Sequence, residues 1–409
     1  MDSKAYERLQ KDIYKTVMEK LDFGRDYSDR EIAELIDDVI VLVSKSESID
    51  ISYRGRIKKD VYYAIRKLDV LQQFIDDADI TEIMVNGKDN IFIEKHGVLE
   101  KTNCTLGTEE KLKTLIFQMV SKCNRCVNES SPIVDARLED GSRVNIVLNP
   151  VSIDGSTITI RKFPKNPITM DSLIKMQSIS EEAVLFLQKL VVSGYNIFIS
   201  GGTGSGKTTF LNALSGFIPL EERIITIEDS AELQLLKAPN LVRLETRNKN
   251  AEGCQEITIR DLIRTSLRMR PDRIIVGEVR GGEAVDLLQC LNTGHDGSMS
   301  TGHGNSAKDM LSRLEMMVLM GMDLPIEAVQ RQIASGIDIL VHLGRLRDKS
   351  RKVLQVVEIL EYVNGEILLN TLFEYKETGE DENGKVTGIL LKKGELVHKE
   401  KLLAAGVTI

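Results

Sequence analysis

Residues 201–208 read Gly-Gly-Thr-Gly-Ser-Gly-Lys-Thr and match the pattern G-x-x-x-x-G-K-[ST]. A short apolar run, Tyr195-Asn-Ile-Phe-Ile-Ser200, precedes them, and a helical pattern of apolar residues follows from Thr209. In this setting a buried strand, a glycine-rich turn and a helix N-terminus direct several backbone N–H groups at one point, where the helix dipole adds positive potential. The stretch therefore predicts a phosphate-binding loop in an α/β domain.

Each residue type in this loop has a defined chemistry. The glycines allow the chain to curl around a phosphate without Cβ clashes. Lys207 reaches the β- and γ-phosphates as a point charge, and the Thr208 hydroxyl ligates Mg²⁺. An ordinary glycine turn before a helix is the alternative, which the strand–loop–helix setting disfavours. We expect ATP and Mg²⁺ to be bound by Gly201, Gly202, Thr203, Gly204, Ser205, Gly206, Lys207, Thr208 and Thr209.

The composition limits the class of protein. The 409 residues are 42% hydrophobic and 28% charged, which is typical of a globular protein of two or three domains. The formal net charge of −8 argues against a nucleic-acid translocase, because such proteins usually carry a basic surface. The sequence contains no run of 18 apolar residues, so we expect no membrane span. The N-terminus lacks the apolar core of a secretory signal. We therefore expect a cytosolic protein.

The five cysteines include one close pair, Cys123-Asn-Arg-Cys126. An odd number of cysteines in a cytosolic protein suggests free thiols. The pair is either half of a zinc site, a redox pair or two small hydrophobic residues at the end of an amphipathic helix. A tetrahedral zinc site needs two further ligands, and the sequence offers no second pair of suitable spacing. We favour the packing interpretation.

Apolar periodicity divides the chain into five segments. Residues 1–68 show helical spacing, and residues 69–163 combine short strands with one helix, as in a small α+β domain. Two prolines in Phe163-Pro-Lys-Asn-Pro167 begin a linker that we place at 164–179. Residues 180–375 alternate helix and strand and predict the α/β domain. The polar, turn-rich residues 376–409 are expected to form a surface appendage.

Two apolar strands of this α/β domain end in acidic residues. Arg223-Ile-Ile-Thr-Ile-Glu-Asp-Ser230 ends its strand at Glu228, and Arg273-Ile-Ile-Val-Gly-Glu278 ends at Glu278. Ligands bind at the carboxyl ends of parallel strands, so both acids are expected on the edge of the phosphate loop. One carboxylate would bind Mg²⁺ through its water shell and the other would activate water. We assign Glu278 to the metal and Glu228 to water, and these roles are interchangeable; solvated strand ends are the alternative.

Two of the five histidines lie in the segment Thr293–Asn305, after the second acidic strand. An imidazole donates a hydrogen bond to a phosphate oxygen or responds to the presence of a γ-phosphate. We therefore expect His295 and His303 to form a nucleotide sensor. The alternatives are packed structural histidines or a zinc site, and the latter lacks a cysteine or a third histidine nearby in the sequence.

Taken in order, these four segments resemble the Walker A, Asp, Walker B and His boxes of the type II/type IV secretion and pilus-assembly ATPases. The resemblance covers about residues 70–375. The spacing of eight between His295 and His303, together with residues 267–281 and 292–298, is most similar to the CpaF-type ATPases of Flp (tight-adherence) pili. One departure is Gly304, where the family box usually has Ala.

This resemblance implies a RecA-like P-loop ATPase domain joined to a smaller α+β N-terminal domain and a helical N-terminal extension. It implies a homohexamer that binds ATP between the two domains, acts on a pilus or secretion platform protein, and associates peripherally with the inner face of the cytoplasmic membrane. It also implies arginines that reach the nucleotide from the N-terminal domain or a neighbouring subunit; the candidates are Arg137, Arg143 and Arg161, followed by Arg268, Arg270 and Arg280. A conjugative DNA translocase and a non-hydrolysing scaffold remain the alternatives.

Overall fold

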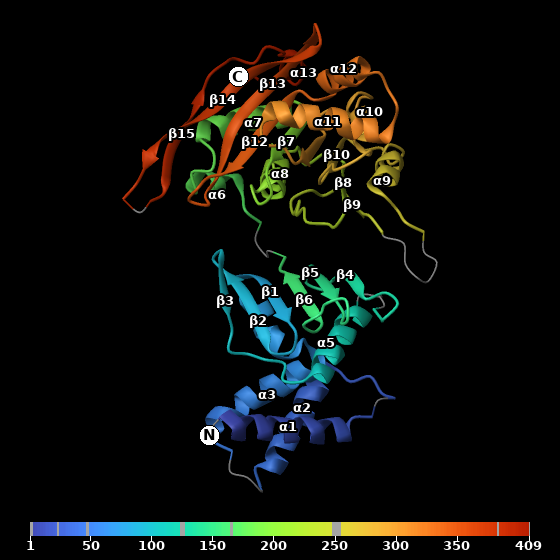
Figure 1. The fold of residues 1–409 in the computed structure, drawn as a ribbon, viewed down its shortest axis with the longest axis vertical. Helices are drawn as coiled ribbons and strands as arrows, with labels where there is room; N and C mark the ends of the chain where they lie inside the picture. Colours follow the sequence, from blue (N-terminus) through green and yellow to red (C-terminus); the bar gives the residue numbers. More distant parts are fainter. Residues whose placement is uncertain are drawn as a thin grey trace. The chain divides into compact units, whose positions relative to one another are not determined.

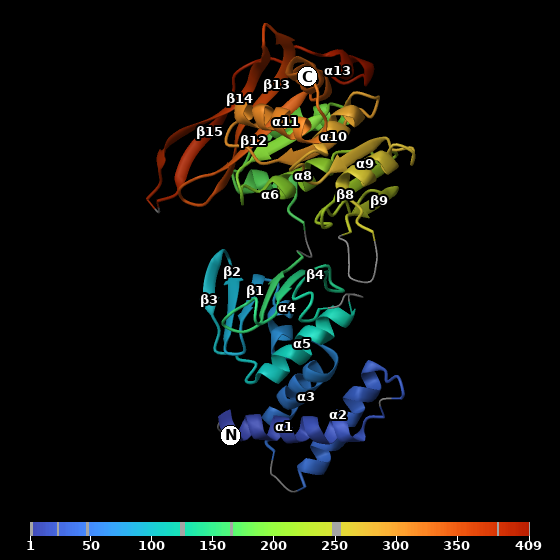
Figure 2. The ribbon, with the colours of Figure 1, turned by 45° about the vertical axis from the view of Figure 1, so that its right-hand side comes forward.

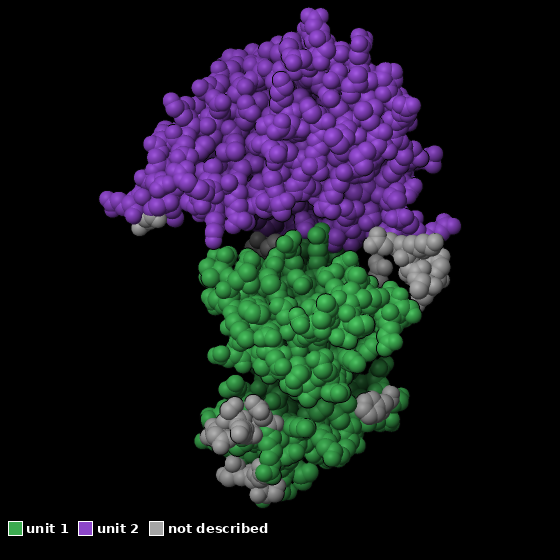
Figure 3. All heavy atoms as spheres, viewed as in Figure 1, with its two compact units in different colours: residues 1–165 green, residues 166–409 purple. Residues whose placement is uncertain are grey.

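The computed structural model describes residues 3–22, 24–45, 49–122, 127–163, 167–247, 255–382 and 384–408. The chain forms two compact units, residues 1–165 and residues 166–409 (Figure 3). Within the described ranges, no helix is both long enough and apolar enough to cross a bilayer. Cys123, Cys126 and Cys254 lie outside these ranges; of the described cysteines, Cys290 is buried and Cys104 is half-buried.

Three helices begin the first unit: α1 (Ser3–Lys20), α2 (Asp29–Val43) and α3 (Ile51–Arg66) (Figures 1 and 2). Helix α2 starts at a capping box, in which the Ser28 side chain accepts the Glu31 N–H and the Glu31 side chain accepts the Ser28 N–H. Apolar residues at helical spacing bury against one another between the helices, which gives this segment a core of its own.

The second part of the first unit is a sheet covered by a helix. The six strands pair antiparallel in the order β3-β2-β1-β6-β5-β4. Alternate side chains such as Ile83 and Ile158 are buried against α5, which supplies Leu112 and Ile116. The elements are η1 (Asp69–Leu71), α4 (Gln72–Asp76), β1 (Ile80–Asn86), β2 (Asn90–Lys95), β3 (Val98–Lys101), α5 (Glu109–Lys122), β4 (Ile133–Arg137), β5 (Arg143–Val147) and β6 (Thr157–Arg161).

The second unit is built on a nine-stranded sheet of order β15-β14-β13-β12-β7-β11-β10-β8-β9. Strands from β12 to β9 in this order are parallel, and β13 to β15 extend the sheet antiparallel. The strands are β7 (Ile197–Gly201), β8 (Ile224–Glu228), β9 (Leu241–Glu245), β10 (Arg273–Val276), β11 (Met299–Gly302), β12 (Ile339–Arg345), β13 (Arg351–Val363), β14 (Glu366–Glu380) and β15 (Val386–Lys392). Apolar runs in the sequence predict eight strands, each of which overlaps one of β7 to β14: 195–200, 223–227, 241–246, 273–277, 298–301, 338–343, 353–359 and 366–373.

Helices cover both faces of the parallel strands. In β7, Ile197 and Ile199 join one core with α6, α7 and α8, whereas Phe198 joins a second core with α9 to α12 on the other face. Strands that are buried on both faces have continuous apolar sequences, and this pattern allowed the domain to be predicted from the sequence. The helices are α6 (Met170–Lys175), α7 (Glu181–Val192), α8 (Lys207–Ser215), α9 (Ile259–Ser266), α10 (Ala284–Leu291), α11 (Ala307–Gly321), α12 (Ile326–Gly336) and α13 (Glu400–Ala404).

Two expected segments differ from the structure. Residues 376–409 are not an appendage, because β15 pairs with β14 and Leu390 and Leu402 are buried in the same core as β7. Most of the expected linker 164–179 also belongs to the second unit, since α6 and the residue Ile179 pack into that core. Both segments are short and polar on one side, so their few apolar residues did not produce a periodic signal.

The loop between β10 and α10 packs closely on the end of α11. A Cβ added at Gly321 would lie 2.2 Å from the Gly282 carbonyl oxygen. We therefore expect Gly321→Ala to lower the stability of the second unit by about 1–3 kcal/mol, as overpacking does. Gly55 in α3 has no atom near an added Cβ, so Gly55→Ala should raise stability by about 0.5–1 kcal/mol. Chemical denaturation with a spectroscopic probe in each unit measures the free energy of unfolding of both variants. If Gly321→Ala leaves this free energy unchanged, the backbones at Gly282 and Gly321 can move apart without loss of stability.

Candidate active site

The phosphate loop joins β7 directly to α8. Gly204 and Gly206 have φ values of +72° and +93°, which side chains rarely adopt, so glycine is required at these turns. Gly206 caps α8 without a side-chain hydrogen bond, and the first N–H groups of a helix have no partner within the helix. These donors and the helix dipole together form an anion site, with Gly202, Thr203 and Gly204 exposed.

The ammonium group of Lys207 is held inside this loop. Lys207 is only 8% exposed, and its Nζ lies 3.2 Å from the carbonyl oxygens of Gly201 and Gly202, to which it donates. Its third neighbour is His303 Nδ1, also at 3.2 Å. Burial lowers the pKa of Lys207, and the nearby Glu278 carboxylate opposes this shift. The lysine is thus held between neutral acceptors that an anionic ligand can replace.

Strands β10 and β11 place Glu278 beside His303. His303 Nε2 lies 2.8 Å from Glu278 Oε1, and Arg280 Nη2 donates to Glu278 Oε2 at 2.8 Å. Arg280 Nη1 also lies 3.8 Å from Asp229 Oδ2. Burial, followed by the charge of Lys207, lowers the pKa of His303, so the imidazole is neutral at neutral pH. A continuous polar chain therefore runs from Lys207 through His303 to Glu278.

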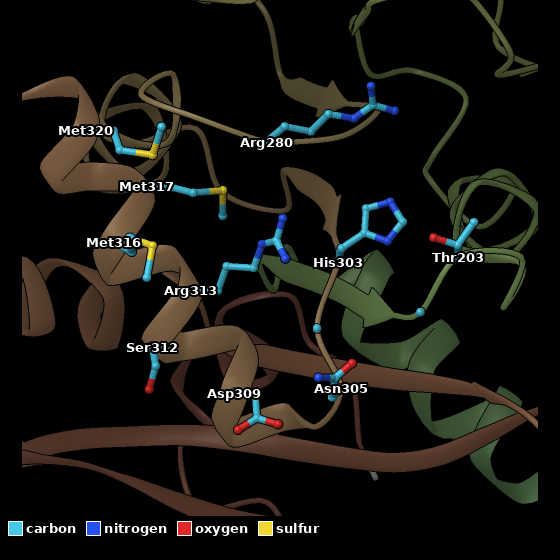
Figure 4. Close-up of a pocket in the computed structure, with 12 residues that line it drawn as sticks. Thr203, Arg280, His303, Asn305, Asp309, Ser312, Arg313, Met316, Met317 and Met320 are labelled. Carbon is cyan, nitrogen blue, oxygen red and sulfur yellow. The ribbon is translucent and has the colours of Figure 1, made fainter.

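Beside this chain lies a cavity of about 820 Å³. Figure 4 shows Thr203, His303 and Arg280 around it, with Met316, Met317 and Met320 of α11 on the opposite side. The cavity brings loop, histidine and arginine together at the carboxyl edge of the parallel strands, where ligands bind in such sheets.

Glu228 ends β8 at the same edge, but its side chain points elsewhere. It is 3% exposed, and its Oε2 accepts the N–H groups of Glu232 at 2.7 Å and Leu233 at 3.0 Å. Within the described part of the chain, its buried Oε1 has no hydrogen-bond partner. Burial raises the pKa of Glu228. One carboxylate oxygen thus fixes the following loop, and the other remains available as an acceptor.

His295 does not lie beside the phosphate loop in this chain. It precedes β11, whereas His303 follows it, and β11 runs parallel to β7. The four residues of the strand alone span about 13 Å, which places the two histidines at opposite edges of the sheet. His295 Nδ1 lies 3.5 Å from Thr293 Oγ1, and its carbonyl accepts the Ser298 hydroxyl. The spacing of eight residues therefore includes a whole strand, which the sequence pattern alone did not reveal.

With this geometry in place, comparison with known proteins gives the family. The "Type II/IV secretion system protein" family model matches residues 65–385. This chain belongs to that family. A putative conjugal transfer protein of Mycobacterium tuberculosis is 32% identical over 312 residues, which cover 74% of this chain and 87% of the relative. The type IV secretion system protein PtlH of Bordetella pertussis is 34% identical over 302 residues, covering 68% and 89%.

A solved structure supports the fold of this secretion-family protein. The pilus retraction motor PilT with bound ADP aligns with a TM-score of 0.52 and 20% identity, covering 74% of this chain and 81% of that one. The second unit is thus the three-layered α/β fold of the secretion ATPases, as the sequence predicted.

Three arginines of this family member lie side by side on the sheet of the first unit. Arg137 of β4 pairs directly with Arg143 of β5, which pairs with Arg161 of β6. Directly opposed residues share one face of a sheet, and like charges so placed are unfavourable. Arg161 Nε donates to Glu82 Oε1 at 2.8 Å across the next strand. The three residues share one face of the sheet, and guanidinium groups are donors of the kind that bind an anion.

Magnesium would be held here by few protein atoms. Among the described residues, no group of three or more His, Cys, Asp or Glu side chains forms a metal site. The residues fit Mg²⁺ nevertheless, because this ion keeps several waters and takes its other ligands from phosphate oxygens. The half-buried Thr208 and the Glu278 carboxylate are donors of the right kind.

Sequence reasoning missed two arginines next to the phosphate loop. Arg345 and Arg351 oppose each other across the β12–β13 hairpin, and Arg351 Nε donates to the Gly204 carbonyl at 2.9 Å. A Cβ at Gly204 would lie 3.8 Å from Arg345 Nη1. No local pattern distinguishes these residues from other surface arginines, since only the fold of the sheet brings them to the loop.

Proposed function

We propose that this protein is an ATP-hydrolysing motor of the type II/IV secretion family, most similar to the CpaF-type pilus ATPases. The observation that carries the proposal is the polar chain Lys207–His303–Glu278 next to an open phosphate loop. The spacing of the two histidines supports the CpaF type. In this proposal the protein works in the cytoplasm at the inner face of the membrane and acts on a pilus or secretion platform protein.

The chemistry follows from the side chains. ATP phosphates bind the loop N–H groups of 202–208, and Lys207 exchanges the carbonyls of Gly201 and Gly202 for phosphate oxygens. Thr208 and, through water, Glu278 would hold Mg²⁺, which would neutralise charge on the phosphates. When Lys207 turns to phosphate, His303 Nδ1 loses its contact with the ammonium group. A proton taken up at Nδ1 would then let the imidazole donate to a γ-phosphate oxygen while Nε2 stays beside Glu278. In the proposed reaction Glu228 turns toward the phosphate loop from its buried position, and its Oε1 accepts a proton from the attacking water.

We further propose that the arginine row of Arg137, Arg143 and Arg161 faces nucleotide in a hexameric ring. Three guanidinium groups on one face of the sheet carry planar donor forks of the kind that bind phosphate oxygens. Arginines that stabilise the transition state raise phosphoryl-transfer rates by roughly 10³–10⁵ in known enzymes. His295, at the far edge of its own sheet, is assigned to contacts other than the nucleotide bound by the same chain.

Replacing the central arginine tests this assignment. We expect Arg143→Ala to reduce ATP turnover by roughly 100-fold or more, because it removes phosphate donors. The first unit should remain folded, because its core is formed by the apolar residues between the sheet and α5 and does not include Arg143. Steady-state phosphate release and circular dichroism measure the two effects. Arg56→Ala, an exposed arginine of α3, is the control, and equal turnover in both variants would exclude the row from the site.

The proposed function is tested by measuring ATP turnover of the wild-type chain and the mass of its particles with and without nucleotide. We expect turnover, and a particle of six chains that nucleotide stabilises. The conjugal transfer relative makes a DNA-dependent motor the second candidate, and strong stimulation of turnover by DNA would favour it. Nucleotide binding without any turnover would favour a scaffold instead.

A further inference from the structure

A buried histidine lies in the sheet directly behind the phosphate loop. His342 belongs to β12, and the strand register pairs it with Ser200 of β7, which pairs in turn with Gly302 of β11. Ser200 immediately precedes the first glycine of the phosphate loop, and Gly302 immediately precedes His303. The three residues thus form one row across the sheet, next to both segments of the candidate active site.

The surroundings of His342 are apolar. Residues 339–343 of β12 are all buried, and among them His342 alone has a polar side chain. Side chains alternate along the strand, so His342 shares the face of Leu340, whose neighbours are the apolar residues of α9 to α12. Burying an imidazole in such a core is unfavourable unless its nitrogens are hydrogen-bonded. The bonds of this ring therefore indicate why a histidine is placed here.

The imidazole of His342 connects two segments that are far apart in the sequence. Its Nδ1 lies 2.8 Å from the Oγ of Ser200, and the ring also makes a hydrogen bond with the backbone of Asn305. Burial lowers the pKa of His342, and the bond to Asn305 and the charge of Asp309 oppose this shift, so the ring is neutral at neutral pH. A neutral imidazole has one donor and one acceptor nitrogen, which suits a backbone carbonyl and a hydroxyl group.

Asn305 belongs to the short segment that carries His303. This segment runs from the end of β11 to Ser306, the residue that caps the N-terminus of α11. Figure 4 shows His303 and Asn305 on it, both beside the larger cavity. A bond from the sheet to Asn305 therefore restricts the position of the backbone two residues after His303.

The phosphate loop and His303 are thus connected twice. On the side of the cavity, Lys207 contacts both the Gly201 carbonyl and His303 Nδ1. In the proposed reaction Lys207 turns to phosphate, and this connection is lost. The bonds of His342 do not involve Lys207, so they still hold the His303 segment at a fixed distance from the start of the loop when phosphate is bound.

We propose that His342 is a positioning residue, which couples the phosphate loop to His303 by binding Ser200 on one side and Asn305 on the other. This inference rests on the proposed function and goes beyond it, since that function assigns no role to His342. The ring acts through His303 and touches no phosphate itself. An interaction that orients a group for the transition state changes kcat rather than the binding of substrate.

Steady-state ATP turnover of the full-length chain tests the coupling. His342→Leu should lower kcat on the order of tenfold, the equivalent of one lost hydrogen bond, and leave the KM for ATP unchanged, because the loop N–H groups and Lys207 remain. His342→Gln should recover part of this loss, since its amide can still donate to the Asn305 carbonyl. Adding Ser200→Ala to His342→Leu should cost little more, because both changes break the same connection.

Leu340→Ala is the matched control. Leu340 lies two residues earlier on the same face of β12, so the substitution damages the same core without removing either bond. Below the unfolding midpoints of both variants, Leu340→Ala should keep the kcat of the wild-type chain. An equal fall of kcat in Leu340→Ala and His342→Leu, or a raised KM with unchanged kcat in His342→Leu, would overturn the inference.

Amide hydrogen exchange without nucleotide tests the connection independently of turnover. In His342→Leu, exchange in residues 303–306 should be faster by roughly tenfold, whereas exchange in α7, on the other face of the sheet, should not change. Unchanged exchange in residues 303–306 would contradict the proposed role of His342. Absence of turnover in the wild-type chain would instead contradict the proposed function, and the exchange result would still decide whether His342 holds the segment.

Discussion

Lys207→Ala is expected to reduce ATP turnover at least 100-fold, roughly the loss seen when a single preorganised donor is removed from an active site. The lysine is nearly buried, and three acceptors around the loop hold its ammonium group. Without it, the N–H groups of the loop remain, but the buried ammonium group that contacts the Gly201 and Gly202 carbonyls is lost. Binding of ATP should weaken as well, because the interaction with phosphate exists in the ground state too.

Turnover and nucleotide affinity of the purified chain measure this effect. Lys401→Ala is a suitable control, since Lys401 is a half-buried lysine of the same unit whose Nζ lies 2.7 Å from Asp338 and Asp296. Particle mass should be unchanged by Lys207→Ala if the loop has no structural role. Undiminished turnover in this variant would mean that hydrolysis takes place at another site.

Glu228→Gln is expected to reduce turnover by roughly 10²–10⁴ while ATP still binds, the range for removal of a general base. The substitution keeps the size of the side chain and an oxygen for the N–H groups of Glu232 and Leu233. What it removes is the basic, unpartnered oxygen. Single-turnover kinetics separates this effect from binding. Asp229→Asn is the control, because Asp229 is the neighbouring and more exposed acid. If the wild-type chain and Glu228→Gln hydrolyse ATP equally slowly, this result supports the alternative of a non-hydrolysing scaffold.

The pH profile gives an independent check on Glu228. Burial raises its pKa above the usual carboxylate value, and only the ionised form accepts a proton. Turnover should therefore decline as the pH falls through this raised pKa, and the Glu228→Gln variant should lack that acid limb. If the limb persists in the variant and disappears in Glu278→Gln, the roles of the two acids are exchanged.

Local patterns predicted the second unit well because buried parallel strands and a glycine loop have strong sequence signals. The run from Tyr195 to Thr208 specified a strand, a loop and a helix start within a few residues, and the two acids marked the strand ends. The capping box that begins α2 is likewise a local pattern, with Ser28 and Glu31 three residues apart. In each case, neighbouring residues in the sequence determine the structure.

Features that depend on pairing between distant segments could not be predicted from the sequence. The position of His295 depends on where β11 begins, and the positions of Arg345 and Arg351 depend on a hairpin far from the phosphate loop in the sequence. The alignment of the three arginines follows from strand register, which single residues do not reveal. Glu228 was placed on the correct edge, but the bond of its carboxylate to its own following loop was not foreseen.

Residues 398–402 are anchored at the sheet edge opposite the phosphate loop. Tyr195 donates its hydroxyl proton to the His398 carbonyl at 2.6 Å, and Lys401 pairs with Asp338, just before β12. A fluorophore or surface tether attached at Leu403 would therefore sit behind the catalytic edge without obstructing it. Optical or single-molecule recordings of the proposed motor can begin from that position.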